Sequence, residues 1–230
     1  MKNLVIGGGH GGSDVGCIAV DKSYEKTYTL ELSKKVYDIC KPYVNTTMLR
    51  TSDKDLSLGE RYRLANSKAP CYYFSFHFNA FNNSAKGIEI YTSQFTSQTN
   101  KDFASYLCKE FSKQFGTSNR GGKVKSGNNG DYYYLHRNTN SNVTTFIIEP
   151  LFIDNKYDFE ILKSPNFIDK AANFFASKIL SNLYGINMSK ADNNKKLYRI
   201  QVGAFNDKKN AEDMAGKLKR LGFESIITED

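Results

Sequence analysis

Three apolar segments of the sequence each lead to a residue that can do acid, base or metal chemistry. Leu4–Ile6 precedes His10, Cys71–Phe76 precedes His77, and Val143–Ile148 precedes Glu149. Such runs predict buried strands, and the carboxyl ends of parallel strands lie along one edge of a sheet, where ligand sites form. A helix predicted to begin near Glu25 would bring a second carboxylate to the same edge. We therefore expect these four side chains to converge.

Two imidazoles and one carboxylate would make a three-ligand zinc site with an open fourth position for water. A second carboxylate nearby could take the proton of that water. Zinc lowers the pKa of bound water to about 7 and polarises an amide carbonyl, so the set could hydrolyse an amide at neutral pH. From the residues alone, either Glu25 or Glu149 could be the ligand.

Each histidine also has an ordinary structural explanation. His10 follows a glycine run and could be a loop residue, and His77 follows an aromatic strand and could be a core residue with its hydrogen bonds satisfied. The remaining histidine, His136, lies in the aromatic run Tyr132–His136 and is interpreted as structural. Only the expected convergence of the strand ends favours a metal site over these explanations.

The glycines after the first strand also match a dinucleotide-binding fingerprint, Gly7-x-Gly9-x-x-Gly12. That motif requires a helix directly after the glycines, because the helix N-terminus holds the pyrophosphate. The following segment, Ser13–Val20, has no helical spacing of apolar residues. We therefore reject a dinucleotide site.

The remaining segments alternate between helix and strand patterns. Apolar residues at helical spacing predict helices from near Glu25 to Ile39, with Ser23 as N-cap, and over Gly59–Ala65, Lys101–Phe115 and Asn166–Leu183. Further strands are expected over Thr46–Leu49 and Gly87–Thr92, and a glycine-rich loop over Gly121–Gly130. Alternating elements with continuously apolar strands predict an α/β fold, with a mostly parallel sheet covered by helices on both faces.

The sequence predicts a main domain over residues 1–184, a polar linker over 185–197 and a small C-terminal piece over 198–230. Within that piece, Tyr198–Phe205 and Ser225–Thr228 are expected to be strands on either side of a helix. A β-α-β unit this short has difficulty burying its own faces. It therefore looks incomplete.

Charge and cysteine content limit the class of protein. The net charge is +8, and residues 191–230 hold eight basic and seven acidic side chains, so the main domain carries most of the positive field. A positive field suits nucleic acid, anionic wall polymers and membrane surfaces alike. No Lys/Arg-rich block of nucleic-acid type occurs, so nucleic acid is not expected as a partner.

The four cysteines form no C-x-x-C pair and are expected to be free thiols. Without a signal-peptide pattern or a membrane span, we expect synthesis in the cytoplasm, and any extracellular target would be reached by another route.

Several segments together resemble the type 3 family of N-acetylmuramoyl-L-alanine amidases, in that family's order and separation. They cover about residues 1–184 and include Gly9–Gly12 with Asp14 and Gly16, Glu25, Leu49–Asp53, Leu58–Arg61, Leu64–Asn66, Phe74–Ala80, Gly87–Tyr91, Asn119–Gly121 and Phe146–Asn155. The sequence departs from the family at Pro150 and Leu151, where a different local loop shape is expected.

The resemblance implies a zinc ion held by His10, Glu25 and His77, with Glu149 as general base and later general acid. It also implies a six-stranded sheet, and peptidoglycan as the substrate, cut between N-acetylmuramic acid and L-alanine. The protein is then expected to act on the cell wall after release from the cytoplasm. A phage lysis enzyme and a cellular autolysin both fit. A wall-binding protein without activity and a zinc peptidase of the stem peptide are the alternatives.

The tail Tyr198–Phe205 with its helix resembles the first half of the sporulation-related repeat, a wall-binding module. The partial repeat implies peptidoglycan as a binding partner. It is also expected to form a homodimer if two tails complete each other.

Overall fold

The computed structural model of the protein describes residues 1–128, 130–188, 201–223 and 225–228. The chain divides into two units, Met1–Met188 and Ser189–Asp230. No helix in the described ranges is long and apolar enough to cross a membrane.

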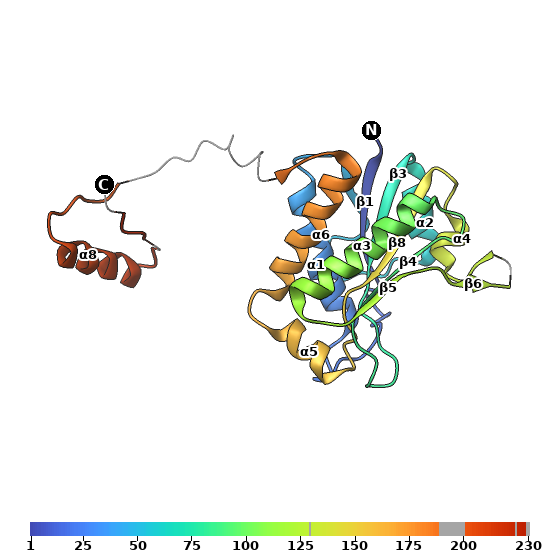
Figure 1. Cartoon of the computed structure of the whole chain (residues 1–230), viewed down its shortest axis with the longest axis horizontal. Helices are drawn as coiled ribbons and strands as arrows, with labels where there is room; N and C mark the ends of the chain where they lie inside the picture. Colours follow the sequence, from blue (N-terminus) through green and yellow to red (C-terminus); the bar gives the residue numbers. More distant parts are fainter. Residues whose placement is uncertain (129, 189–200, 224, 229–230) are drawn as a thin grey trace. The chain divides into compact units, whose positions relative to one another are not determined.

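The first unit alternates strands and helices, as the sequence predicts (Figure 1). Its elements are β1 (Asn3–Gly8), α1 (Glu25–Cys40), β2 (Thr46–Met48), α2 (Leu58–Ser67), β3 (Cys71–Phe76), β4 (Ile88–Thr92), α3 (Gln98–Phe115), β5 (Asn119–Lys123), β6 (Ser126–Gly127), β7 (Gly130–Asp131), α4 (Tyr134–Asn138), β8 (Val143–Glu149), α5 (Lys156–Lys163) and α6 (Phe167–Tyr184).

Six of the strands form one sheet in the order β2-β1-β3-β8-β4-β5. Neighbouring strands are parallel except β4 and β8, which are antiparallel. The predicted α/β class and mostly parallel six-stranded sheet are confirmed. Strands β1, β3 and β8 lie next to one another, so the segments that follow them all emerge from the same edge.

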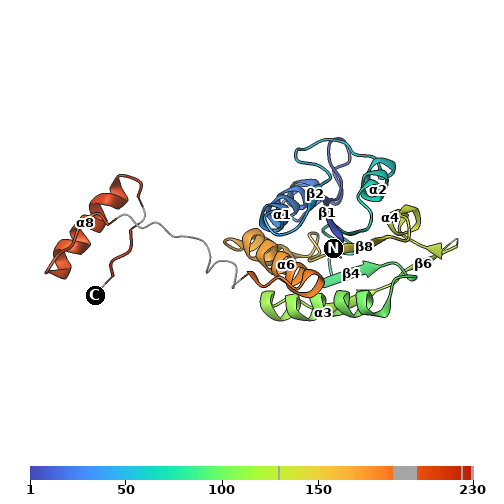
Figure 2. The same cartoon turned by 90° about the horizontal axis from the view of Figure 1, so that it is seen from above.

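The strands bury alternate side chains in two separate cores. Leu4, Phe74 and Phe146 pack with α1, α3 and α6 in the larger core. Val5 and Tyr73 pack with α2 and α4 in the smaller core on the other face. Figure 2 shows α2 and α4 close together, on the other side of the sheet from α6. Burial on both faces explains why these strands are continuously apolar.

Two local predictions differ from the structure. The N-cap of α1 is Tyr24, because the Ser23 hydroxyl is bonded to Asp21 and to the Tyr28 hydroxyl instead of the helix. The predicted loop over Gly121–Gly130 contains part of edge strand β5 and the hairpin β6–β7. The sequence NRGGK has little strand propensity, so pairing with β4 decides the conformation of β5.

The second unit contains α8 (Lys208–Arg220), which confirms its predicted helix. The flanking residues 201–205 and 225–228, expected to be parts of strands, have no strand structure, and 198–200 lie outside the described residues. A strand needs a hydrogen-bonded partner, and an isolated pair is marginal in water. The first unit reaches Met188 because Ile186 and Met188, in the predicted linker, pack against the larger core.

Candidate active site

Three of the predicted site residues meet at the carboxyl edge of the sheet. His10, Glu25 and His77 each offer one donor atom, and these atoms lie within 4.8 Å of one another. Glu25 lies between the histidines, with its Oε2 3.1 Å from His10 Nε2 and its Oε1 3.1 Å from His77 Nδ1. The two imidazole rings are 5.0 Å apart between centroids and nearly perpendicular.

Glu25 is the first residue of α1 and is almost fully buried. The backbone N–H groups of Cys17 and Phe78 donate hydrogen bonds to its two carboxylate oxygens, at 2.9 and 3.0 Å. Burial alone would raise the pKa of this carboxyl, but hydrogen bonds and charge from His10 and His77 hold it well below its ordinary value. Glu25 is therefore an anion in a fixed position.

His10 is oriented by a residue to which the sequence analysis gave no role. Its backbone is left-handed, with φ of 57°, and its Nδ1 lies 2.8 Å from Asp14 Oδ2. The other ring nitrogen, Nε2, is therefore directed at Glu25. A carboxylate behind an imidazole fixes the ring orientation and raises its basicity, as is common behind metal-binding histidines. The four-residue spacing of His10 and Asp14 is the only sequence signal for this pair.

Two buried arginines hold the backbone of the His10 loop. Arg50 Nη2 donates to the carbonyl oxygen of Gly9 at 2.9 Å. Arg61 donates to the carbonyl oxygens of Gly8 and His10, both at 2.8 Å. The sequence analysis assigned no role to either arginine. Together with the Thr29 hydroxyl, which donates to the Gly9 carbonyl oxygen at 2.7 Å, these contacts satisfy the carbonyl groups of the loop.

Two glycines allow the close packing of these side chains. A Cβ atom at Gly9 would lie 2.2 Å from His77 Cε1, which is shorter than any real contact. A Cβ atom at Gly16 would lie 2.6 Å from Glu25 Oε2. The glycine-rich segment thus provides space for the His77 ring and the Glu25 carboxylate. This explains its glycines without the phosphate-binding site that the Gly7-x-Gly9-x-x-Gly12 spacing could indicate. No helix follows it before α1.

Glu149, the fourth predicted residue, is the last residue of β8. Phe76 pairs with Ile148 in the β3–β8 ladder, so His77 and Glu149 leave adjacent strands side by side. Glu149 Oε2 is buried and has no hydrogen-bond partner among the described residues. Burial, followed by the charges of Glu25 and Glu89, raises the pKa of Glu149 well above its ordinary value. A carboxyl with a raised pKa is a stronger base than an ordinary glutamate, and its protonated form persists to higher pH.

Glu89 is a second buried carboxylate beside Glu149, and it has partners. Arg120 Nε and Lys123 Nζ donate to its Oε2 at 2.7 and 2.6 Å. Asn79 and the Tyr91 hydroxyl donate to its Oε1, at 2.8 and 2.9 Å. Glu89 and Arg120 are therefore part of the wall next to Glu149.

His136 and three of the cysteines, Cys40, Cys71 and Cys108, lie outside this cluster, whereas Cys17 contacts Glu25. His136 is buried, its Nδ1 lies 2.6 Å from Thr145 Oγ1, and burial lowers its pKa to about 4. This agrees with the structural interpretation of His136. All four cysteines are free, as predicted.

The donor set fits a zinc ion by its chemistry. Two imidazoles and one carboxylate on separate segments are the ligands of many catalytic zinc sites. The second carboxylate, Glu149, has a buried oxygen free to bind another group. The fold and the site together define an α/β protein with a potential metal centre at the carboxyl edge of its sheet.

Comparison with known proteins identifies the family. The model of the N-acetylmuramoyl-L-alanine amidase family Amidase_3 matches residues 4–181, and the SPOR domain model matches residues 185–230. The chain is 30% identical over 230 residues to the N-acetylmuramoyl-L-alanine amidase CwlM of Bacillus licheniformis, covering 99% of this chain and 85% of that protein. The chain therefore belongs to the Amidase_3 family of N-acetylmuramoyl-L-alanine amidases, and it has a SPOR domain at its C-terminal end.

Solved structures agree with this assignment. Cwp6 from Clostridium difficile is 33% identical with a TM-score of 0.73, over 80% of this chain and 30% of that one. The catalytic domain of the amidase CwlV from Bacillus (Paenibacillus) polymyxa is 29% identical with a TM-score of 0.67, over 80% of this chain and 98% of that domain. The predicted family resemblance is confirmed.

Proposed function

We propose that this protein is a zinc-dependent amidase that hydrolyses the bond between N-acetylmuramic acid and the L-alanine of the peptidoglycan stem peptide. Family membership supports amidase action on peptidoglycan. The observation that carries the zinc dependence is the cluster of His10, Glu25 and His77 donor atoms within 4.8 Å, with the unpartnered oxygen of Glu149 beside it.

In this proposal His10, Glu25 and His77 hold the zinc ion. When bound, zinc polarises the amide carbonyl and lowers the pKa of water, so that hydroxide is available to attack the carbonyl at neutral pH. Asp14 keeps His10 Nε2 directed at the ion by its contact with Nδ1. Arg50 and Arg61 keep the loop in place through the carbonyl oxygens of Gly8, Gly9 and His10.

Glu149 carries the proton in both halves of the reaction. Its Oε2 accepts a proton from the attacking water as the new carbon–oxygen bond forms. The same oxygen then gives that proton to the L-alanine nitrogen as the carbon–nitrogen bond breaks, so that the amine leaves neutral. The raised pKa of Glu149 suits both transfers, because a base that must later act as an acid works best near the working pH.

The SPOR domain supports a second part of the proposal, that the C-terminal unit binds the wall. Concentrating the amidase on an insoluble substrate adds affinity without new contacts in the active site.

Digestion of purified peptidoglycan tests the proposal. Free amino groups and new reducing sugar ends are followed in one sample, with and without a zinc chelator. New L-alanine amino termini without reducing ends, abolished by the chelator and restored by zinc, are expected. Amino termini from another residue would make the protein a peptidase. Wall binding without any release would make it a binding protein on an amidase scaffold.

A further inference from the structure

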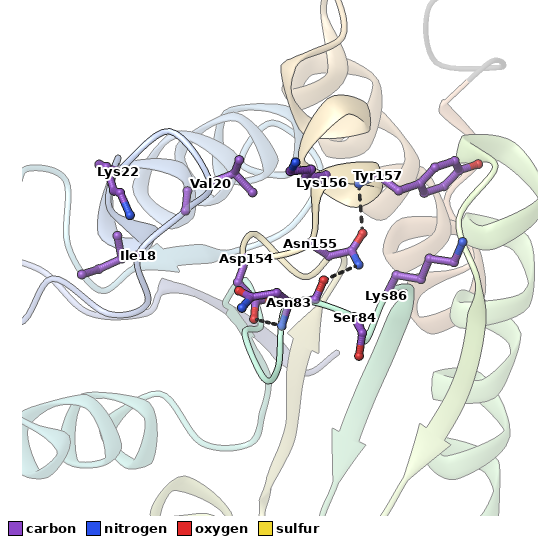
Figure 3. A pocket seen from close by; sticks show the side chains of 11 residues that line it. Ile18, Val20, Lys22, Asn83, Ser84, Lys86, Asp154, Asn155, Lys156 and Tyr157 are labelled. Carbon is purple, nitrogen blue, oxygen red and sulfur yellow. Dashed lines mark hydrogen bonds between the residues drawn. The ribbon is translucent and has the colours of Figure 1, made fainter.

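A pocket of about 810 Å³ opens on the same edge of the sheet as the His10–Glu25–His77 cluster. Its walls are three short segments, residues 18–22, 83–86 and 154–157. Figure 3 shows Ile18 and Lys22 on one side of the pocket and Lys86 and Tyr157 on the other.

Each wall continues a segment that carries a site residue. Residue 18 follows Cys17, whose N–H donates to Glu25, the second wall follows His77, and the third follows Glu149. The walls are joined by a bond from Val20 N to the Ile153 carbonyl at 3.0 Å and one from Asn83 N to Asp154 Oδ2 at 2.9 Å. Asp154 is five positions after Glu149 in the chain, so the pocket begins within roughly 17 Å of the Glu149 backbone. A short peptide spans that distance.

The pocket has three cationic side chains without anionic partners. Lys22, Lys86 and Lys156, one from each wall, are exposed. None of them forms an ion pair with any side chain in the part of the chain that the structure describes. Lys86 Nζ lies 4.4 Å from the centre of the Tyr157 ring, which leaves its charge available to an anion.

The lining also offers apolar surface. Ile18 and Val20 are 53% and 38% exposed, so a ligand could cover them. Asp154 Oδ2 accepts from the N–H groups of Phe81 and Asn83, so this carboxylate ties the second wall to the third. A ligand that matches this pocket has a carboxylate and small apolar side chains, as a short acidic peptide does.

We propose that this pocket binds the stem peptide of the substrate, with a free peptide carboxylate paired to Lys22, Lys86 and Lys156. This inference rests on the proposed function, because the stem peptide is the leaving side of that reaction. In the bound state, alanine side chains contact Ile18 and Val20. The glycan strand is a poorer occupant, since its one carboxyl, on the lactyl group, is already used in the amide.

The test measures binding of the free peptide product, which needs no turnover. Calorimetry is run with L-alanyl-D-glutamyl-L-lysine and with the same peptide whose carboxylates are converted to carboxamides. The variant Lys22→Gln/Lys86→Gln/Lys156→Gln is compared with Lys34→Gln/Lys109→Gln/Lys113→Gln, which removes the same charge from exposed positions on α1 and α3. For three exposed ion pairs we expect the pocket variant to bind the acid peptide about tenfold more weakly. The control variant should bind it as wild type does.

The carboxamide peptide separates charge pairing from other effects. Wild type should bind it about as weakly as the pocket variant binds the acid peptide, and the pocket variant should lose nothing further. If the pocket variant lost equal affinity for the acid and the carboxamide peptide, or lost affinity for neither, the proposal would be overturned. So would unchanged peptide binding together with weaker binding to poly(glycerol phosphate), which would assign the lysines to an anionic wall polymer. If wild type binds the peptide as expected but releases no L-alanine termini from peptidoglycan, the proposed reaction fails and the pocket assignment stands.

Discussion

Glu89 of β4 lies directly opposite Glu149 of β8 in the antiparallel ladder, and only Glu89 has cationic partners. The Glu89 charge is one of the causes that raise the pKa of Glu149, after burial and the charge of Glu25. Arg120 and Lys123 offset part of that charge. Side chains outside the proposed metal ligands therefore contribute, after burial and Glu25, to the raised pKa of the proposed base.

Substitutions of Glu89 and Lys123 should move the acid limb of the pH profile in opposite directions. Glu89→Gln removes a negative charge beside Glu149, so the pKa of Glu149 falls and the acid limb of kcat/KM moves to lower pH, by on the order of one unit. Lys123→Gln leaves more of the Glu89 charge unbalanced and moves the limb to higher pH. Shifts in the same direction in both variants would mean that another group controls this limb.

Glu149→Gln should keep zinc and lose activity. The amide cannot take the proton of the attacking water, and general-base contributions are on the order of 10²–10⁴, so the rate on soluble muropeptide should fall at least about 100-fold. Metal analysis of the purified protein checks that zinc is retained. His77→Ala is the matched comparison, in which both zinc content and activity should be lost. Near-normal turnover of Glu149→Gln would require a different base.

Gly9→Ala should release zinc although the residue binds no metal. Its methyl group would lie 2.2 Å from His77 Cε1, so the ring would have to move away from its position beside Glu25. Zinc titration with a competing chelator measures the loss of affinity. Gly216→Ala on α8, where a Cβ meets nothing within 4 Å, is the control and should titrate as wild type. Equal affinities in both variants would show that the loop adapts to the added methyl.

His136 should make the fold sensitive to acid. Its pKa is about 4 in the folded state because of burial, against 6.5 ordinarily, so between these values the unfolded chain binds a proton that the folded chain does not. Stability is then lost as pH falls from 6.5 towards 4, by roughly 2 kcal/mol between pH 7 and pH 5. Urea unfolding of wild type and His136→Gln at both pH values measures this. The variant should lose about 2 kcal/mol less than wild type over that interval.

The C-terminal unit should associate with a second copy through its apolar side chains. Val202, Phe223 and Ile226 are 59%, 63% and 91% exposed, and none of the side chains of α8 is buried. Light scattering of residues 1–230 should give twice the monomer mass. Residues 1–188, which keep Ile186 and Met188 on the larger core, should give the monomer mass. Monomer masses for both would contradict association through the tail.

Strands β1, β3 and β8 could be predicted from the sequence because their side chains are apolar on both faces of the sheet. Once β1, β3 and β8 are parallel neighbours, the positions of His10, His77 and Glu149 follow from the order of the strands. Asp14, Arg50 and Arg61 received no role from sequence reasoning, because they act on backbone carbonyls and a ring nitrogen that only the folded loop brings near them. Strand β5 was missed because its residues have weak strand propensity and pair only in tertiary context.

The bonds from Arg50 and Arg61 to the His10 loop also bear on how the protein would acquire the proposed zinc ion. A zinc finger orders its chain only when metal arrives, so chelation unfolds it. Here the left-handed backbone at His10 is held by arginines from the segment between β2 and the end of α2. Most of the entropic cost of ordering the His10 loop thus arises when the protein folds, and little of it is left for metal binding. We expect depletion of the ion to leave a folded protein that reloads directly, without a refolding step.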